Sequence, residues 1–218
     1  KGKLQVNAGG TATNVTLKQG GALVTSTAAT VLGSNRLGNF SVENGMADNV
    51  VLENGGRLDV LSGHTATNTH VDEGGTLDVR SGGTATTVSM RAGSVLLADS
   101  GASISGHYDD GGMFSIGDGR AAGLTLGTGS VFTLQEGDST RDTTVNGGQL
   151  TAHGGTLEGT TTLNNGATLT LSGKTVNNDT LTIREGDALL QGGSLTGNGS
   201  MEKSGSGTLT VSNTTLTQ

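Results

Sequence analysis

The sequence predicts an all-β fold, a parallel β-helix, and three observations lead to it. Glycine-opened segments recur along nearly the whole chain, short Leu-x-Val runs follow the glycines, and no apolar residues recur at helical spacing. Gly, Thr, Ser and Asn dominate, and they are poor formers of helix interiors. The openings are Gly2, Gly21, Gly38, Gly56, Gly75, Gly93, Gly112, Gly129, Gly148, Gly166, Gly186 and Gly207.

The spacing of these openings is typical of a solenoid. The 11 steps from the first opening to the last average about 18.6 residues, and repeats of this length stack side by side. Leucine-rich repeats share the period, but they require a Leu-rich consensus that this chain lacks. We therefore expect about 12 coils of roughly 18-19 residues, each buried against its neighbours.

The clearest copy of the repeat starts at Gly56, and the plan begins again at Gly75. Side chains alternate between the two faces of a strand. Leu58 and Val60 are therefore expected to face the core, and Asp59 the solvent.

A segment rich in Thr, Ala and Asn follows the first strand of both copies, after a glycine turn. By the same alternation we expect Thr69 and Val71 to face inward. Asn68 and His70 are then expected to face outward.

Composition narrows the class of protein. The chain has 40 Gly and no Pro, Cys or Trp among 218 residues, and its formal net charge is −7. A negative charge disfavours nucleic-acid binding, which requires basic patches. A hydrophobic content of 31% leaves disorder as an alternative, but the regular return of Leu-x-Val argues against it.

The repeat predicts one elongated domain over residues 1-218, with irregular turns near 33-38 and 103-114. The chain begins and ends in mid-pattern, which indicates a segment of a longer β-helix. The second irregular stretch carries the single Tyr and two adjacent acids, Asp109 and Asp110.

Stacking places equivalent outward residues about 4.8 Å apart, one strand spacing, and so predicts two polar ladders. One consists of Gln5, Ser41, Asp59, Asp78, Ser115 and Thr151. The other is the candidate self-association surface and consists of Asn14, Asn49, Asn68, Thr87, Asp142 and Thr160. Short polar side chains on a flat face can hydrogen-bond to a second copy, and many weak contacts then add up. Each residue is also explained by a purely solvent-facing position.

Asp59 and Asp78 are expected on adjacent coils, where two like charges repel. Neighbouring Arg57 and Arg80 are the plainest source of relief, and a cation or a partner's lysine are the alternatives.

Calcium binding through Asp72, Glu73, Asp109 and Asp110 is a further possibility, because calcium prefers oxygen ligands. The calcium-binding β-roll repeat Gly-Gly-x-Gly-x-Asp is absent from the sequence, so no cofactor is expected.

Catalytic chemistry has little support in the sequence. Glycoside hydrolysis needs two carboxylates across a cleft, and only Asp59 and Asp78 are expected close together. The histidines lack the spacing of a metal site or a triad; they are His64, His70, His107 and His153. We expect no enzyme activity, no catalytic residue and no metal ligand.

Two segments carry a resemblance to a known family, and it extends over essentially the whole chain. They are Leu4-Gln5-Val6-Asn7-Ala8-Gly9-Gly10-Thr11-Ala12-Thr13-Asn14-Val15 and residues 175–193, Thr-Val-Asn-Asn-Asp-Thr-Leu-Thr-Ile-Arg-Glu-Gly-Asp-Ala-Leu-Leu-Gln-Gly-Gly. Both resemble the later half of the passenger domain in the antigen 43 family of self-associating autotransporter adhesins.

The resemblance implies a right-handed parallel β-helix at the surface of a Gram-negative bacterium, attached to the outer membrane through a C-terminal barrel outside these residues. It implies homotypic, head-to-tail pairing with a copy on a neighbouring cell, and hence autoaggregation and biofilm formation. In the family, polar residues on one face make this contact. Sugars on Ser and Thr, and calcium in one branch, are also implied.

Two alternatives stay open beside self-association. One is a carbohydrate-active β-helix with a carboxylate-lined cleft, for instance near Asp109 and Asp110. The other is a rigid spacer that holds a recognising segment away from the cell. The sequence does not separate a spacer from an interface.

Overall fold

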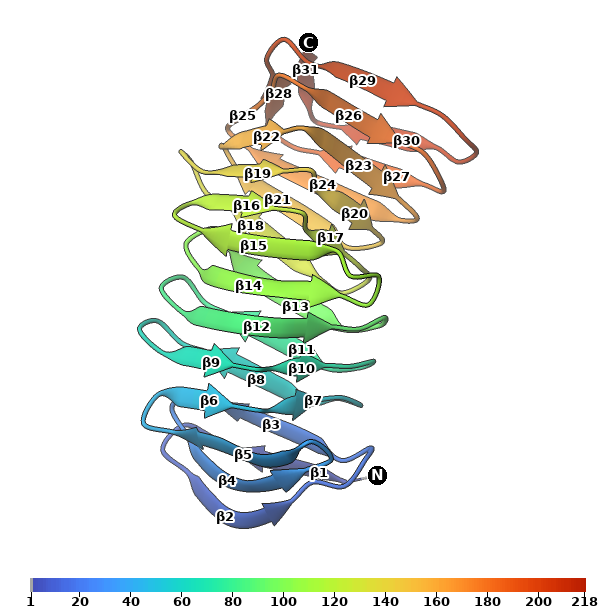
Figure 1. Cartoon of the computed structure of the whole chain (residues 1–218). Coiled ribbons are helices and arrows are strands. Elements are labelled where there is room, and N and C mark those ends of the chain that lie inside the picture. The colour runs from blue at the N-terminus through green and yellow to red at the C-terminus, as the bar shows by residue number, and fades with distance from the viewer. Residues whose placement is uncertain (1) are drawn as a thin grey trace. The chain divides into compact units, whose positions relative to one another are not determined.

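The computed structural model describes residues 2–218, which form short β-strands joined by turns. They belong to two compact units, Lys1–Phe114 and Ser115–Gln218. Within each unit, successive turns of the chain stack through parallel strand pairs (Figure 1). The fold is a parallel β-solenoid of about 11 turns, so the predicted fold class is confirmed.

The first side of each unit is a parallel sheet. In unit 1 its strands are β1 (Lys3–Val6), β3 (Ala22–Ser26), β8 (Arg57–Val60), β11 (Thr76–Val79) and β13 (Val95–Asp99). In unit 2 they are β18 (Val131–Leu134), β21 (Gln149–His153), β24 (Ala167–Ser172), β27 (Ala188–Gln191) and β30 (Leu209–Ser212). Identical register keeps like residues together, since Leu58 pairs with Leu77 and Val60 with Val79.

The second side contains most of the remaining strands. In unit 1 these are β2 (Thr11–Thr16), β4 (Thr30–Asn35), β5 (Gly38–Glu43), β6 (Met46–Asp48), β9 (Thr65–Thr67), β12 (Thr84–Met90) and β14 (Ser103–Tyr108). Then follow β15 (Met113–Gly117), β16 (Arg120–Ala122), β19 (Ser139–Arg141), β22 (Thr156–Glu158), β25 (Lys174–Asn177), β28 (Ser194–Thr196) and β31 (Thr215–Thr217).

The third side differs between the units. In unit 1 it consists of the short strands β7 (Val51–Leu52) and β10 (His70–Val71) and of the end of β12, where His70 pairs with Ser89. In unit 2 it is a sheet of its own, with β17 (Thr125–Leu126), β20 (Thr144–Asn146), β23 (Thr160–Asn164), β26 (Thr180–Ile183) and β29 (Ser200–Lys203).

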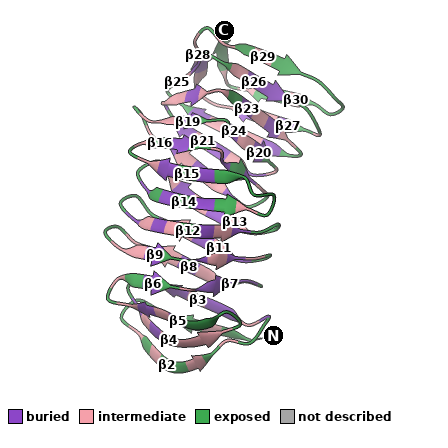
Figure 2. Cartoon of the chain, viewed as in Figure 1, coloured by how far each residue is buried: buried purple, intermediate pink, exposed green. Residues whose placement is uncertain are grey.

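The core of each unit consists of the inward-facing residues of these strands. Buried residues alternate with half-buried and exposed ones along the strands (Figure 2). In the coil that starts at Gly56, Leu58 and Val60 are fully buried and Asp59 is half-buried. Thr69 and Val71 are also buried, whereas Asn68 is exposed and His70 is half-buried, so the predicted facing of this coil is confirmed.

Two predicted coil openings, Gly38 and Gly112, are wrong, because the chain reverses direction there instead of starting another coil. Residue Gly38 begins β5, which runs antiparallel to both β4 and β6. The first sheet omits this stretch, and β3 pairs directly with β8 through Val24↔Arg57 and Ser26↔Asp59. We call the segment Thr30–Asp48 the first hairpin insertion. Such insertions lower the count from the predicted 12 coils to about 11.

A related reversal follows Gly112, where β15 and β16 pair in antiparallel orientation through Ile116↔Ala121. Both reversals use the same tight turn, in which two consecutive residues have positive φ, a requirement of type I′ hairpins. The turn residues are Asn44 (φ 51°) and Gly45 (φ 74°) in the first, and Asp118 (φ 53°) and Gly119 (φ 74°) in the second. A single segment over residues 1–218 stays a prediction.

Within residues 2–218, no helix has the length and apolar character that crossing a bilayer demands.

Candidate adhesive surface

Five of the six candidate self-association residues occupy one kind of corner, where the second side of a coil gives way to the third. Each has a positive φ: Asn14 57°, Asn49 58°, Asn68 54°, Thr87 56° and Asp142 53°. Left-handed backbone is unfavourable for L-residues, and Asn and Asp tolerate it best after Gly. The backbone conformation therefore explains why Asn and Asp occupy these corners, whether or not a partner contacts their side chains.

Thr160 is the exception among the six. Gly159, with φ 64°, takes the left-handed position of its coil, and Thr160 begins β23 one residue later. The Thr160 N–H donates to Asp142 Oδ1 at 3.0 Å. The two residues of unit 2 in the candidate set are thus connected to one another, although only Asp142 is a corner residue.

Three corners of unit 1 follow one another on successive coils. The Asn49 N–H donates to Thr67 O, and the Asn68 N–H donates to Thr86 O, each at 3.1 Å. The side chains of Asn68 and Thr87 are exposed, whereas Asn49 is half-buried. We call Asn49, Asn68 and Thr87 the corner ridge.

Asn49 differs from its neighbours because its side chain is used internally. Its Nδ2 donates to Asn39 O at 2.9 Å and also contacts Leu37 O at 3.5 Å, which ties the corner to the first hairpin insertion. Among residues 2–218, by contrast, the side chains of Asn14 and Asn68 make no hydrogen bond, so their amides are available to a partner.

Asn14 lies apart from the corner ridge, because the first hairpin insertion separates its coil from that of Asn49. The six candidates therefore do not form one continuous ladder. The structure groups Asn49, Asn68 and Thr87 in unit 1, and Asp142 with Thr160 in unit 2.

The other predicted ladder is only partly correct. Gln5, Asp59 and Asp78 belong to the first sheet of unit 1, and Thr151 belongs to the first sheet of unit 2. Ser41 and Ser115 lie instead in the antiparallel strands β5 and β15. The glycines that start these segments, Gly38 and Gly112, have the sequence of a coil opening, but the strands after them pair in antiparallel orientation.

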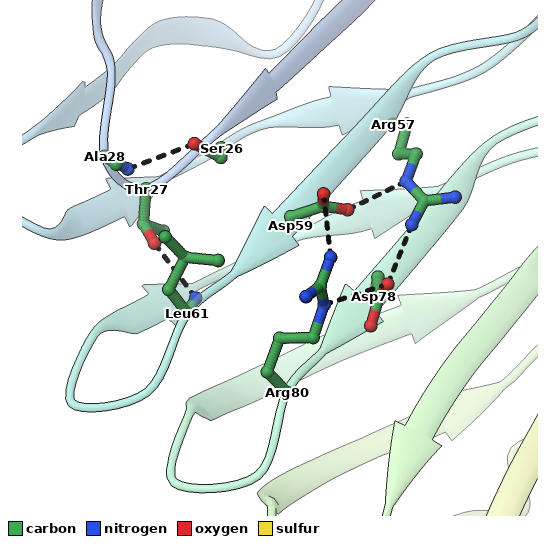
Figure 3. Close-up of polar contacts among 8 residues, drawn as sticks. All are labelled: Ser26, Thr27, Ala28, Arg57, Asp59, Leu61, Asp78 and Arg80. Carbon is green, nitrogen blue, oxygen red and sulfur yellow. Dashed lines mark hydrogen bonds and ion pairs between the residues drawn. The ribbon is translucent and has the colours of Figure 1, made fainter. Parts of the chain in front are cut away.

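Asp59 and Asp78 pair side by side on β8 and β11, and two arginines neutralise them (Figure 3). Arg57 Nε contacts Asp59 Oδ1 at 2.8 Å, and Arg57 NH2 contacts Asp78 Oδ2 at 2.7 Å. Arg80 completes the group at 3.3 Å from Asp59 Oδ2 and 3.2 Å from Asp78 Oδ2. The arginine explanation is confirmed, and we call these four residues the ionic quartet.

The ionic quartet shifts the pKa values of two of its members. The hydrogen bond to Asp59 raises the pKa of Arg57, and both carboxylates reinforce the shift. Burial raises the pKa of Asp78 against the opposing effect of Arg80. Both carboxylates accept arginine hydrogen bonds, and Arg57 and Asp59 also line a hollow of about 280 Å³.

Three of the four acidic residues considered for calcium, Asp72, Asp109 and Asp110, contact other groups. Asp72 pairs with Arg36, and its Oδ1 lies 4.0 Å from Arg91 Nε. Asp109 lies 3.5 Å from Arg91 Nε, and Asp110 Oδ1 accepts the Gly112 N–H at 2.7 Å. Within residues 2–218, no three His, Cys, Asp or Glu side chains converge as a metal site would require.

Two of the four histidines lie beside hydroxyl groups. His64 Nδ1 lies 2.7 Å from Thr27 Oγ1, and His153 Nδ1 lies 2.6 Å from Ser172 Oγ. Burial, followed by the nearby Arg36 charge, lowers the pKa of His70.

The comparisons with known proteins agree with this architecture. The family described as "Adhesin of bacterial autotransporter system, probable stalk" matches residues 32–94 and 105–167, which is more than half of the chain. The chain belongs to this family of autotransporter adhesins. Both matched segments start in a strand, β4 or β14, that directly precedes an antiparallel strand pair in the sequence.

Two curated relatives are similar in sequence. The autotransporter adhesin/invasin TibA of Escherichia coli O78:H11 is 36% identical over 187 residues, which cover 84% of this chain and 18% of TibA. The autotransporter CRAC of Citrobacter rodentium is 58% identical over 45 residues, 21% of this chain and 3% of CRAC. The chain thus spans less than a fifth of the length of either relative.

A crystal structure of a TibC-catalyzed hyper-glycosylated TibA fragment, residues 55–350 of that protein, covers 96% of this chain at 18% identity. The match extends over 94% of the fragment, with a TM-score of 0.32, too low for an argument about the arrangement of coils. Family membership itself assigns the chain to the bacterial surface, where autotransporter adhesins are anchored to the outer membrane.

Proposed function

We propose that this chain takes part in homotypic adhesion: it binds a second copy on a neighbouring cell and so promotes autoaggregation and biofilm formation. The observation that carries the proposal is the corner ridge, three uncharged polar residues with a single carboxylate, Asp48, beside them, on a chain whose net charge is −7. Two identical acidic molecules repel one another in general. A strip with a single carboxylate is where they can approach at low electrostatic cost.

The chemistry of the corners suits a weak contact that is repeated many times. Exposed amides and hydroxyls exchange water for a partner with a net gain of only about 0.5–1.5 kcal/mol per hydrogen bond. A cell that carries many copies multiplies such contacts, so low affinity per molecule suffices. Membership of the antigen 43 branch, and head-to-tail geometry, belong to the same proposal.

Glycine substitutions test the corner residues without disturbing the backbone. Because Gly accepts positive φ, Asn14→Gly, Asn49→Gly, Asn68→Gly and Thr87→Gly remove the side chains and keep the coil path. The quadruple variant should keep the coil path with a modest loss of stability, because Asn49→Gly also removes the bonds to Asn39 O and Leu37 O. Cells displaying it should settle more slowly from suspension than cells displaying the wild-type protein. Asn54→Gly is the matched control, since Asn54 has φ 53° and is exposed but lies at a different corner.

One observation favours a spacer as the second candidate. The family is described as a stalk, and a stack of coils suits a role in holding another segment away from the cell. If the quadruple variant settles as fast as the wild type and its circular dichroism is unchanged, the corners play no part in adhesion. The spacer is then the better account.

A further inference from the structure

The row of corners in unit 1 is broken at the first hairpin insertion, and the break forms a groove. Ala12 pairs with Val31 and Val15 pairs with Gly33, so Thr13 and Asn14 together stand opposite Leu32 alone. Strand β4 is one residue shorter than β2 at this point and has no left-handed corner residue. The surface is therefore lower beside Asn14.

The resulting groove has a volume of about 410 Å³ and is open to solvent. We call it the notch; it is lined by Thr13, Asn14, Val15, Thr16, Leu32, Gly33, Ser34 and Asn39. None of these eight residues is charged. Among residues 2–218, the side chains of Thr13, Asn14, Ser34 and Asn39 make no hydrogen bond, which leaves donors and acceptors around an apolar floor at Leu32.

Gly33 allows β4 to approach β2 closely beside the notch. A side chain at this position would place Cβ only 2.0 Å from the O atom of its paired residue Val15, so no larger residue fits without moving the backbone. The neighbouring strand is fixed by its pairing, because Ser34 pairs with Asn39 and Gly33 with Phe40. The notch is thus built into the strand pairing and does not depend on a movable loop.

We propose that the notch receives the Asn68 corner of a second copy of this chain. The inference rests on the proposed homotypic adhesion and names the surfaces that meet. Asn68 and Thr67 are consecutive exposed residues, and the Asn68 amide is uncharged and makes no hydrogen bond within residues 2–218. The Thr67 hydroxyl donates to Asp48 Oδ1 at 3.0 Å, so one carboxylate lies beside this corner and can accept from the amide groups that line the notch. An acidic chain offers few surfaces that another acidic copy can enter, and the uncharged notch is one of them.

Both halves of the contact lie on every copy, in unit 1. Two copies related by a twofold axis can therefore make the contact twice, as isologous interfaces do. A saccharide is a less suitable occupant, because the lining residues include no aromatic side chain on which a sugar ring could stack. One such contact is smaller than the roughly 1,000 Å² of a stable interface, so we expect weak pairing that many copies strengthen.

Disulfide trapping tests the contact directly, since the chain has no cysteine of its own. One preparation carries Ser34→Cys in the notch, and the other carries Thr67→Cys beside the corner, which avoids substitution of the left-handed residue itself. A disulfide requires Cα atoms about 4.4–6.8 Å apart, so mild oxidation of the mixture should enrich the mixed dimer only if notch and corner meet. Thr133→Cys, at a half-buried position of β18, replaces the Thr67→Cys partner in the control mixture.

A second variant measures the effect on adhesion. Ser34→Arg fills the notch from an outward position and should slow the settling of cells displaying the protein by about tenfold, whereas Thr133→Arg should leave settling unchanged. Mixed dimers that exceed the control, together with slow settling of Ser34→Arg cells, support the proposal.

Two results would overturn it and are distinguishable. If wild-type cells settle normally but no mixed dimers form, the notch is not the contact, and the proposal of homotypic adhesion stands. If wild-type cells do not aggregate, the proposed function is wrong as well. If added saccharide and no second copy protects the notch cysteine from alkylation, the occupant is a sugar and the proposal is wrong.

Discussion

The regular coil Arg57–Val71 and the first hairpin insertion Thr30–Asp48 have similar sequences and different topologies. Each contains a strand with a glycine at or just before its start, Gly38 in β5 and Gly56 before β8, and each alternates apolar and polar residues. A left-handed asparagine follows in both, Asn68 within the coil and Asn49 directly after the insertion. The coil sends its backbone hydrogen bonds to strands in the coils on either side. The insertion directs β5 back against β4 and forward again into β6.

The difference lies in how the strands beside a turn pair. At Asn44-Gly45, two consecutive left-handed residues form a tight reversal, and β5 and β6 pair with one another directly across it. Paired positive φ values do not decide the strand direction alone, because Asn54-Gly55 has them at a corner between β7 and β8, which do not pair with one another. Side-chain alternation is the same in both regions and does not decide between them.

The largest expected effect concerns the shared core. Phe40 of the insertion is 3% exposed, and its removal in Phe40→Ala should cost about 3–5 kcal/mol of unfolding free energy. Leu58→Ala, in the regular coil, should cost about 2–5 kcal/mol. Chemical denaturation measures both values. Hydrogen exchange should show faster opening of β4 to β6 in Phe40→Ala and of β8 in Leu58→Ala; identical exchange patterns would mean that the two regions open as one.

The corner of the regular coil should be the next most sensitive position. Asn68→Val forces a β-branched residue into φ 54°, which should cost about 1–3 kcal/mol, while Asn68→Gly should be nearly neutral. Thermal unfolding of the two variants measures the difference. Equal melting temperatures would show that the Asn68 backbone is not held in the left-handed region.

The ionic quartet should contribute less to the unfolding free energy than the core residues or the Asn68 corner. Arg57 is partly exposed in its side chain, at 39%, and solvent screens its two contacts. Arg57→Gln should therefore cost below about 1 kcal/mol at low salt, and less as salt rises. Unfolding at two salt concentrations measures the effect, with Arg120→Gln on the exposed strand β16 as the control. A large cost that salt leaves unchanged would contradict a screened surface pair.

The smallest effect depends on pH and concerns His70. Its folded-state pKa is lowered from the ordinary value of 6.5, so the folded protein binds this proton less readily than the unfolded chain. The neutral ring favours folding above pH 6.5, and this contribution is lost as the pH falls from there through the lowered folded pKa. His70→Gln should make the unfolding free energy less dependent on pH in this window; the charges that face His70 are those of Arg36, Asp72 and His107.

Proton titration of the native protein by NMR checks the His70 shift directly. A His70 midpoint at or above 6.5 would remove the basis of this prediction.

The sequence alone predicts the coil, the inward residues and the relief of Asp59 by arginines, because all three follow from alternation and stacking. It does not predict that Gly38 starts a returning strand. Asn44-Gly45 is a pair typical of hairpin turns, but the same dipeptide occurs at Asn54-Gly55 and Asn165-Gly166, which lie at corners of parallel coils. The period of about 18.6 residues also masked the reversal, because the insertion has nearly the same length as a coil.

The candidate site was less predictable for a different reason. Asn14, Asn49, Asn68, Thr87 and Asp142 were selected as outward polar residues, but they share a backbone conformation. Sequence shows the residue type without showing whether the backbone or a partner requires it. The notch also depends on a one-residue difference between β2 and β4, which becomes visible only once their register is known.

The first hairpin insertion also bears on how the chain folds. Regular coils pair residues 19 positions apart, such as Leu58 with Leu77, so each coil must close a sizeable loop before it gains a hydrogen bond. In the insertion, Val42 pairs with Ala47 only five positions away. Isolated hairpins form in about 1–10 μs, so this segment can form early and give β9 an ordered edge on which to assemble. A segment that interrupts the stacking of parallel coils can thus act as a nucleus for that stacking.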